Sequence, residues 1–288
     1  MKIAITGGGG LVGKELARIF SAQHQVLALT HRTLDITDSL AVKRLMTAER
    51  PELIINCAVL GVDDCEAKPD LARAVNVEGA RSLAEAAAEI DAEIMHLSTN
   101  YIFEGTREAG TFYTIEDAAL PINKYGETKL AGELAVRIAT PKSYLVRTSW
   151  VFGPGKENFF STAARSLAER KSVRAVNDVW ASVTYLADLV AGIDEILKHG
   201  HYATYQVVNA GVCSHADFAR EIARQLELTP AETETLIETV AESEMRRLAP
   251  RPRYTPMRCL MSEELGLSPM REWQAALSSY LLGLKRSM

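Results

Sequence analysis

The chain has 288 residues with an ordinary composition for a globular protein, 47% hydrophobic and 24% charged, and a formal net charge of -5 at pH 7. No block of basic residues suggests a nucleic-acid partner, and no apolar run of about 18 residues suggests a membrane span. Glycines interrupt the first apolar run, so we expect no signal peptide, and four scattered cysteines without a C-x-x-C pair favour reduced thiols in the cytoplasm over a zinc site.

An apolar strand opens the chain, runs into four glycines and is followed by an amphipathic stretch at residues 14–20. Further strands are predicted at residues 26–30, 53–56, 93–98 and 143–148, with helices between them at residues 38–49, 70–90 and 121–139. Strands and helices that alternate in this way are joined by right-handed crossovers. The pattern therefore predicts an α/β fold with a doubly wound parallel sheet of the Rossmann type.

The alternation weakens after residue 150. Prolines and glycines cluster at residues 153–155 and 250–252, and one more helix and strand are predicted at residues 184–198 and 202–209. We interpret residues 1–150 as an NAD(P)-binding domain that residues 184–208 complete. Most of residues 151–288 is expected to form a smaller, discontinuous substrate-binding lobe, with ligand in the cleft at the carboxyl ends of the strands.

The glycines after the first strand have the spacing Gly7-x-x-Gly10-x-x-Gly13. A strand, a glycine turn and a helix leave backbone N–H groups and the positive end of the helix dipole facing an anion, and positions without a side chain let phosphates approach the backbone. The motif therefore predicts a dinucleotide pyrophosphate at this turn. The same residues also suit a tight turn that binds nothing.

Tyr125 and Lys129 lie four residues apart at the start of a predicted helix, after a strand that ends in Ser98-Thr99. Residues at this spacing share a helix face, so we expect the Lys129 ammonium to lower the pKa of Tyr125 from about 10 toward neutrality. Such a tyrosine is a general acid for a carbonyl oxygen, which Thr99 would orient, and Lys129 would also hold the nicotinamide ribose. The alternative is a chance match on a helix surface.

The second predicted strand ends in Thr30-His31-Arg32, and no acidic residue follows before Asp35. An acidic residue at this point would accept the ribose hydroxyls of NAD and repel the 2′-phosphate of NADP. Arg32 can form a charge-assisted contact with that phosphate, and His31 or Thr30 can add a hydrogen bond. We therefore predict NADPH as the preferred cofactor, with NADH as the second option, against the alternative of a solvated arginine.

Six segments carry recognisable motifs. They are Thr6-Gly7-x-x-Gly10-x-x-Gly13 and residues 35–38, 75–77, 98–105, 125–133 and 147–152. Together they resemble the extended short-chain dehydrogenase/reductases, and within them the dTDP-4-dehydrorhamnose reductase family, over nearly the whole chain. The resemblance implies that Thr99, Tyr125 and Lys129 are catalytic. It also implies a set of cofactor contacts, namely Gly7, Gly10, Leu11, Val12 and Gly13 at the pyrophosphate, Asp35 and Ile36 near the adenine, and Ala58 beneath the ribose.

The resemblance further implies that Tyr101 and Trp150 contact the sugar of the substrate, although Trp150 also suits packing at a hinge. Asn100, which we place with them, stands where the family usually has an aspartate. Residues 178–184 read Asp-Val-Trp-Ala-Ser-Val-Thr where the family usually has Asp-Gln-x-Gly-x-Pro-Thr, which leaves the identity of the sugar nucleotide open. We match no carboxylate set to the magnesium site of some relatives and predict no metal.

The expected reaction is the NADPH-dependent reduction of the 4-keto group of a nucleotide-linked deoxysugar. Related 4,6-dehydratases carry Thr-Asp-Glu at the end of the fourth strand, whereas this chain has Thr99-Asn100-Tyr101, without either carboxyl group. The alternative function is a dinucleotide-binding regulatory subunit, because the β subunit of methionine adenosyltransferase resembles the same reductases. Helices at residues 70–90 and 124–139 pair two subunits in many relatives, so a homodimer is a further expectation.

Overall fold

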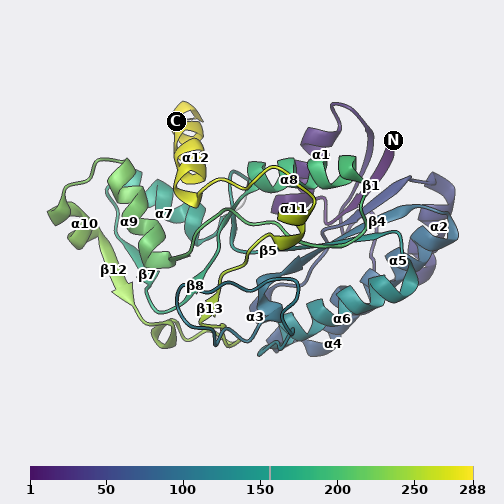
Figure 1. The fold of residues 1–288 in the computed structure, drawn as a ribbon, viewed down its shortest axis with the longest axis horizontal. Coiled ribbons are helices and arrows are strands. Elements are labelled where there is room, and N and C mark those ends of the chain that lie inside the picture. The colour runs from purple at the N-terminus through teal and green to yellow at the C-terminus, as the bar shows by residue number, and fades with distance from the viewer. Residues whose placement is uncertain (156, 288) are drawn as a thin grey trace.

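A six-stranded sheet, all of whose strands run parallel, forms the centre of this computed structural model, which describes residues 1–155 and 157–287. Its strand order is β10-β5-β4-β3-β1-β2 (Figure 1). The bounds are Lys2–Thr6 for β1, Gln25–Leu29 for β2, Leu53–Asn56 for β3, Glu93–Thr99 for β4, Ser143–Thr148 for β5 and Thr204–Gln206 for β10. This confirms the predicted Rossmann-type sheet, with strand boundaries within a few residues of those expected.

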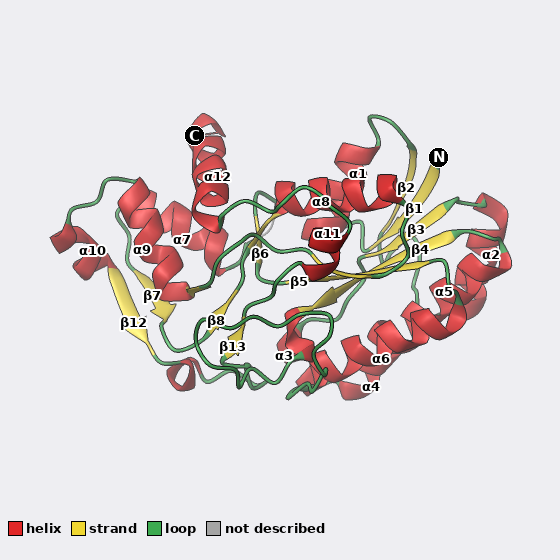
Figure 2. Cartoon of the chain, in the orientation of Figure 1, coloured by secondary structure: helices red, strands yellow, loops and turns green. Residues whose placement is uncertain are grey.

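Helices cover both faces of the sheet (Figure 2). On one face, α1 (Leu11–Phe20) and α8 (Leu186–His199) pack on alternate strand residues such as Ile3 and Ile5. On the other, α2 (Ser39–Glu49), α5 (Ala80–Glu89) and α6 (Lys124–Ala139) pack on the residues in between. Residues on the two faces are both apolar because a parallel sheet is buried on both sides.

The predicted helix at residues 70–90 is divided in the structure. It consists of α4 (Pro69–Arg73), a π-helical segment η1 (Ala74–Gly79) and α5, and a short α3 (Val62–Ala67) precedes it. In the π-helical segment, the Asn76 side chain accepts a hydrogen bond from the Leu60 N–H and donates one to the Thr128 hydroxyl. These two contacts tie the segment to the loop after β3 and to α6, and such irregular turns are often found at functional sites.

A second group of elements follows the sheet strand β5. Its helices are α7 (Phe159–Ala168), α9 (His215–Gln225), α10 (Pro230–Leu236), α11 (Leu260–Glu264) and α12 (Trp273–Ser287). Its strands are β6 (Val151–Phe152), β7 (Val173–Val176), β8 (Trp180–Ala181), β9 (Thr184–Tyr185), β11 (Cys213–Ser214), β12 (Ile237–Val240) and β13 (Tyr254–Thr255). Two short 3-10 turns complete the chain, η2 (Asn100–Ile102) directly after β4 and η3 (Glu242–Met245) in this second group. Residues of α7, α9 and α12 share a core with Phe152 that is separate from the two cores of the sheet.

The helix and strand predicted to return to the sheet are confirmed as α8 and β10, and β10 pairs with β5. The predicted helix start at residue 121 is three residues early, because Asn123 caps the first turn of α6 by accepting a hydrogen bond from the Gly126 N–H at 2.8 Å. No helix among the described residues is both long and apolar enough to cross a membrane.

Candidate active site

The glycine turn between β1 and α1 is a tight, side-chain-free bend. Gly7 has φ +67°, in the left-handed region, and its carbonyl accepts a hydrogen bond from the Gly10 N–H at 2.8 Å. A Cβ at Gly7 would lie 2.6 Å from the Cys57 carbonyl group, and one at Gly13 would lie 2.4 Å from the Gly7 oxygen. The sequence therefore needs glycine here, because the backbones of β1, α1 and the loop after β3 meet at the turn.

The amino-terminal end of α1 faces this turn without a side-chain cap. Gly10 is its N-cap residue, and no side chain hydrogen-bonds to the N–H groups of the first turn, which begins with Leu11 and Val12. Free N–H groups at a helix start, with the positive end of the helix dipole, form an anion site. The structure thus provides, at the predicted residues, a cradle that suits a pyrophosphate and that a Cβ would fill.

The loop after β2 presents its charged side chains to solvent. Arg32 is exposed and has no ion-pair partner among the residues that the structure describes. His31 is also exposed, with Nδ1 3.8 Å from the Asp35 carboxylate. Hydrogen bonds from the Thr37 N–H and hydroxyl hold that carboxylate and keep the pKa of Asp35 below its usual value. Arg32 is therefore the available cation at the end of β2.

Ile36, by contrast, is buried. Its side chain packs in the core beneath η1, where a Cβ added to Gly79 would lie 2.7 Å from Ile36 Cδ1. A contact of this residue with an adenine would therefore come from its backbone. Ala58 lies beside the glycine turn, and its N–H donates to the Asn56 side-chain oxygen at 3.1 Å.

The carboxyl end of β4 and the first turn of α6 bring Thr99 and Tyr125 together. The Thr99 hydroxyl accepts a hydrogen bond from the Tyr101 N–H at 3.1 Å, donates one to Asn100 Oδ1 at 3.3 Å, and lies close enough to the phenol of Tyr125 to lower the pKa of that phenol. The rings of Tyr101 and Tyr125 meet edge to face, with centroids 5.8 Å apart. Burial raises the pKa of Tyr125 to about 12, while the Thr99 hydroxyl opposes this rise.

Lys129 is buried one helical turn further along α6. Its Nζ donates to the Leu97 carbonyl at 2.5 Å and lies 3.1 Å from His96 Nε2, both on β4. Burial lowers the pKa of Lys129 to about 8, and Glu133 raises it. The expected lowering of the Tyr125 pKa is therefore wrong for this structure, because the amine points at β4 and burial dominates the titration of the phenol.

The predicted substrate residues differ in their surroundings. Asn100 is buried and its Nδ2 donates to the Thr255 hydroxyl at 2.7 Å, which joins the end of β4 to β13. Burial raises the pKa of Tyr101, and the nearby Arg251 and Trp150 side chains oppose this rise. Trp150 has φ +39°, and its ring centroid lies 4.3 Å from that of His215 and 5.6 Å from that of Phe160. Tyr101 and Trp150 thus stand where the two groups of elements meet.

A cavity of about 610 Å³ adjoins these residues. Its lining comes from the loop after β4, the segment before β13, Trp180 and Val212, and it includes three arginines, Arg107, Arg251 and Arg253. Arg251 is paired with the Asp63 carboxylate at 2.7 Å, and Arg107 is paired with Asp117. Arg253 is exposed, and the described part of the chain offers it no carboxylate partner. Because Glu104 also lines the cavity and two of the arginines are paired, Arg253 is the lining cation that has no carboxylate partner among the described residues.

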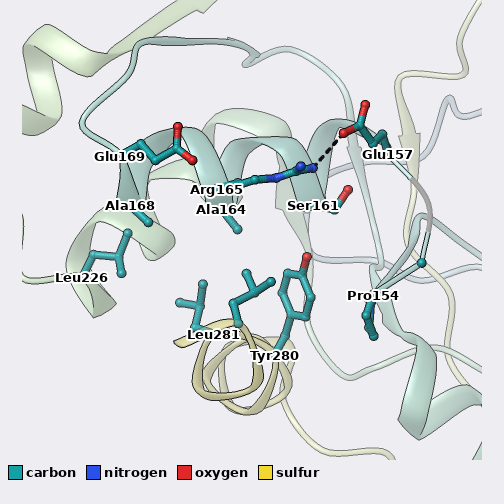
Figure 3. A pocket seen from close by; sticks show the side chains of 13 residues that line it. Pro154, Glu157, Ser161, Ala164, Arg165, Ala168, Glu169, Leu226, Tyr280 and Leu281 are labelled. Atoms are coloured by element: carbon teal, nitrogen blue, oxygen red, sulfur yellow. Dashed lines mark hydrogen bonds and ion pairs between the residues drawn. The ribbon is translucent and has the colours of Figure 1, made fainter. Parts of the chain in front are cut away.

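A second hollow, of about 570 Å³, lies between α7 and α12 (Figure 3). Leu226, Tyr280 and Leu281 line one side of it, and Arg165, paired with Glu157 at 3.0 Å, lies on the other. It contains none of the predicted site residues. The predicted catalytic residues lie instead at the end of β4 and on α6.

Sequence reasoning did not assign His96, Asn56 or Arg253 to the site. His96 is a buried residue that contacts both Asn56 and Lys129, and no motif in the sequence indicates its contact with Lys129. The two are 33 residues apart and become neighbours only when α6 packs on β4. A period-2 reading of β4, which places His96 and Ser98 on the face opposite to Met95 and Leu97, would have been the available signal.

Comparisons with known proteins identify the family of the chain. The family model described as RmlD substrate binding domain matches residues 1–285. A dTDP-4-dehydrorhamnose reductase of Mycolicibacterium smegmatis is 40% identical over 280 residues, covering 96% of this chain and 84% of that protein. A dTDP-4-keto-6-deoxy-D-glucose reductase of Streptomyces niveus is 34% identical, covering 95% of this chain and 94% of that protein.

Among solved structures, the dTDP-4-dehydrorhamnose reductase of Bacillus anthracis in complex with NADP superposes with a TM-score of 0.91 at 32% identity, covering 98% of this chain and 99% of that one. The predicted family, its α/β fold and its oxidoreductase class are thereby confirmed. The chain belongs to the RmlD substrate-binding domain family, whose members here are dTDP-sugar reductases of the extended short-chain dehydrogenase/reductase fold.

Proposed function

We propose that this protein uses NADPH to reduce the 4-keto group of a dTDP-linked 6-deoxysugar, with Tyr125 as the proton donor. The observation that carries this proposal is the placement of Thr99 and Tyr125 close together at the carboxyl end of β4, on the same edge of the sheet as the glycine turn. Ligands of doubly wound folds bind at this edge. The relatives named above, which act on such sugars, support the choice of substrate class.

The cofactor fits the residues present. Gly7, Gly10 and Gly13, with the first N–H groups of α1 at Leu11 and Val12, would hold its pyrophosphate. His31 and Arg32 would hold the 2′-phosphate, Asp35 and the Ile36 backbone would lie near the adenine, and Ala58 and Lys129 would lie near the riboses. When bound, the nicotinamide supplies the hydride that reduces the carbonyl carbon.

Tyr125 supplies the proton. A pKa of about 12 keeps its hydroxyl protonated at neutral pH, so it is ready to donate to a carbonyl oxygen as that oxygen becomes negative. The Thr99 hydroxyl orients the same oxygen and, through its contact with Tyr125, holds the two donors side by side. Lys129 lies one helical turn away, and as an ammonium it would favour the phenolate that remains after donation.

The substrate would lie between the two groups of elements, against Asn100, Tyr101 and Trp150. Most of residues 151–288 would then form the substrate lobe, as the sequence indicates. Arg253 is the cation that we propose for the diphosphate, since it faces the cavity beside Tyr254 without a carboxylate partner among the described residues. The identity of the sugar depends on residues 178–184, which depart from the usual family pattern.

Two further parts of the proposal concern assembly and location. Leu134 and Ile138 on α6 have exposed fractions of 53% and 86%, and this apolar edge supports a homodimer through α6. The four cysteines are free thiols, which supports the reducing cytoplasm as the compartment. Because the formal net charge is -5, we propose no nucleic-acid partner.

The test is the oxidation of NADPH, followed by absorbance, with a panel of dTDP-4-keto-6-deoxysugars. Steady turnover with at least one of them, and its loss in Tyr125→Phe, is the expected result. Tight binding of NADPH without turnover on any member of the panel would instead favour the regulatory-subunit function.

A further inference from the structure

A chain of buried polar side chains connects Lys129 to the strand that leads into the glycine turn. Its members are Thr6 on β1, Asn56 on β3, His96 on β4 and Lys129 on α6, each with an exposed fraction of 2% or less. The Thr6 hydroxyl donates to Asn56 Oδ1 at 2.8 Å, Asn56 Nδ2 lies 3.0 Å from His96 Nδ1, and His96 Nε2 lies 3.1 Å from Lys129 Nζ. All four of these connected side chains are therefore buried.

The orientation of the Asn56 amide is fixed by its neighbours. Its oxygen accepts from the backbone N–H of Ala58 at 3.1 Å and from the Thr6 hydroxyl. A rotated amide would place an NH2 group against the Ala58 N–H, donor to donor. Asn56 Nδ2 therefore faces His96 Nδ1, and because an amide NH2 only donates, Nδ1 is the acceptor and carries no proton.

This assignment also determines the protonation of Nε2, the other ring nitrogen of His96. A neutral histidine with a bare Nδ1 carries its proton on Nε2, so His96 donates toward Lys129. Only a neutral amine has the lone pair to accept that hydrogen bond, and the amine still has an N–H for the Leu97 carbonyl. Burial acts in the same direction, since it lowers the pKa of His96 well below its usual value and the pKa of Lys129 to about 8.

We propose that His96 is a positioning residue for Lys129, which it holds against β4 as a neutral amine by donating its Nε2–H, so that Lys129 becomes an ammonium only as it leaves His96. The charge that would act on Tyr125 is thus generated together with the movement of the side chain toward Tyr125. This consequence for catalysis rests on the proposed function, whereas the hydrogen-bond state of His96 and Lys129 does not.

Other titratable groups also face Lys129. Glu133 lies on the same helix and favours the ammonium, but it is paired with Arg147 on β5, at 2.7 Å. Cys57 follows β3 and Cys65 lies on α3, and burial raises the pKa of both thiols, to about 12 for Cys57. Both thiols are therefore neutral near pH 7 and leave His96 as the direct hydrogen-bond partner that distinguishes the two forms of Lys129.

The test uses the full chain without substrate or cofactor, so it is independent of turnover. Nitrogen-15 shifts of labelled histidine give the tautomer of His96, assigned by comparison with His96→Gln. Carbon-13 shifts of labelled lysine give the pKa of Lys129, assigned with Lys129→Arg. We expect a neutral His96 with the proton on Nε2, and a Lys129 that titrates near pH 8, so that the neutral amine held by His96 is the main form of Lys129 above that pH.

Two variants then separate the hydrogen bond from simple packing. His96→Phe keeps a planar ring without the donor, and loss of one hydrogen bond to the neutral amine should raise the pKa of Lys129 by about 0.5 to 1. His96→Gln can place an N–H where Nε2 lies and should stay close to the parent value. Tyr205→Phe is the matched control. Tyr205 lies on the far strand β10, and the substitution removes its part-buried hydrogen bond to the His201 carbonyl.

A proton found on Nδ1 of His96, or an imidazolium at neutral pH, would overturn the proposal. This measurement needs only the parent protein, so it stands whether or not a variant folds. A Lys129 pKa that His96→Phe leaves unchanged or lowers would also overturn it. Absence of turnover on every sugar nucleotide would refute the proposed function and leave these spectra as they are, so the two failures are distinct.

Discussion

The glycine turn after β1 and the end of β4 lie at the same edge of the parallel sheet but are built differently. The turn offers backbone N–H groups, and what it requires is the absence of side chains at Gly7 and Gly13. The end of β4 offers side chains whose protonation depends on burial and on partners from β3, β4 and α6. A backbone site is thus specified by a few neighbouring residues, whereas a proton-donating site is specified by the packing of several elements.

The largest effect is expected at the end of β4, where side chains rather than backbone groups form the proposed site. In Tyr125→Phe the proton donor is lost while the ring stays, so turnover should fall about 100-fold or more with little change in NADPH affinity. Steady-state kinetics and a fluorescence titration of NADPH measure the two quantities. Tyr202→Phe, which removes an exposed phenol hydroxyl that bonds Glu93, is the control, and unchanged turnover in Tyr125→Phe would remove Tyr125 from its role.

The backbone end is tested by adding one methyl group. In Gly13→Ala the Cβ would lie 2.4 Å from the Gly7 oxygen, so α1 must shift away from the turn, and we expect a loss of about 1–3 kcal/mol in the free energy of unfolding together with weaker NADPH binding. Gly9→Ala is a matched control, because its Cβ meets only Thr30 Cγ2 at 3.8 Å. Equal denaturation midpoints and NADPH affinities for the two variants would contradict the close approach.

The next smaller effect is expected at Arg32, whose side chain would add a cofactor contact to those of the glycine turn. A charge-assisted contact of about 1.5–3 kcal/mol between Arg32 and the 2′-phosphate corresponds to a preference for NADPH over NADH of about tenfold or more. Titrating both cofactors against the parent protein and Arg32→Ala measures this preference. If the parent binds both equally, or if the variant keeps the preference, Arg32 does not contact the phosphate.

The smallest effect is expected at the boundary between the two groups of elements. An aromatic contact of about 0.5–1.5 kcal/mol between Trp150 and the sugar or base would make Trp150→Ala raise the KM for the substrate about two- to tenfold, whereas Trp150→Phe keeps part of it. The ring also packs on Phe160 and His215, so the thermal midpoint is recorded alongside. A change confined to NADPH affinity would show that Trp150 serves only packing.

The same comparison explains how far sequence reasoning reached. The glycine spacing and the alternation of strands and helices predicted the sheet and the turn, because both depend on residues close together in the chain. The four-residue spacing of Tyr125 and Lys129 predicted that they share a helix, but it did not predict their pKa values. The pKa of Tyr125 rises instead of falling, because desolvation by residues from other elements outweighs a neighbour one helical turn away.

The division of the long helix at η1 was also beyond a periodicity argument. Residues 70–90 have an unbroken helical pattern, but Asn76 hydrogen-bonds outside its own helix, to Leu60 and Thr128. A Cβ at Gly132 on α6 would lie 2.3 Å from the Asn76 carbonyl oxygen, so the two helices touch at this point. Such an irregularity arises from a contact between elements and has no local signature.

The sixth strand of the sheet has a consequence for the synthesis of the protein. β10 lies beside β5, which is buried along residues 143–147, but it follows β5 by more than fifty residues in the chain. Until residues 204–206 have left the ribosome, β5 is an edge strand with unpaired N–H and C=O groups, which is a surface prone to aggregation. A nascent or truncated chain that stops near residue 150 therefore carries the glycine turn and the proposed catalytic residues on an unfinished sheet.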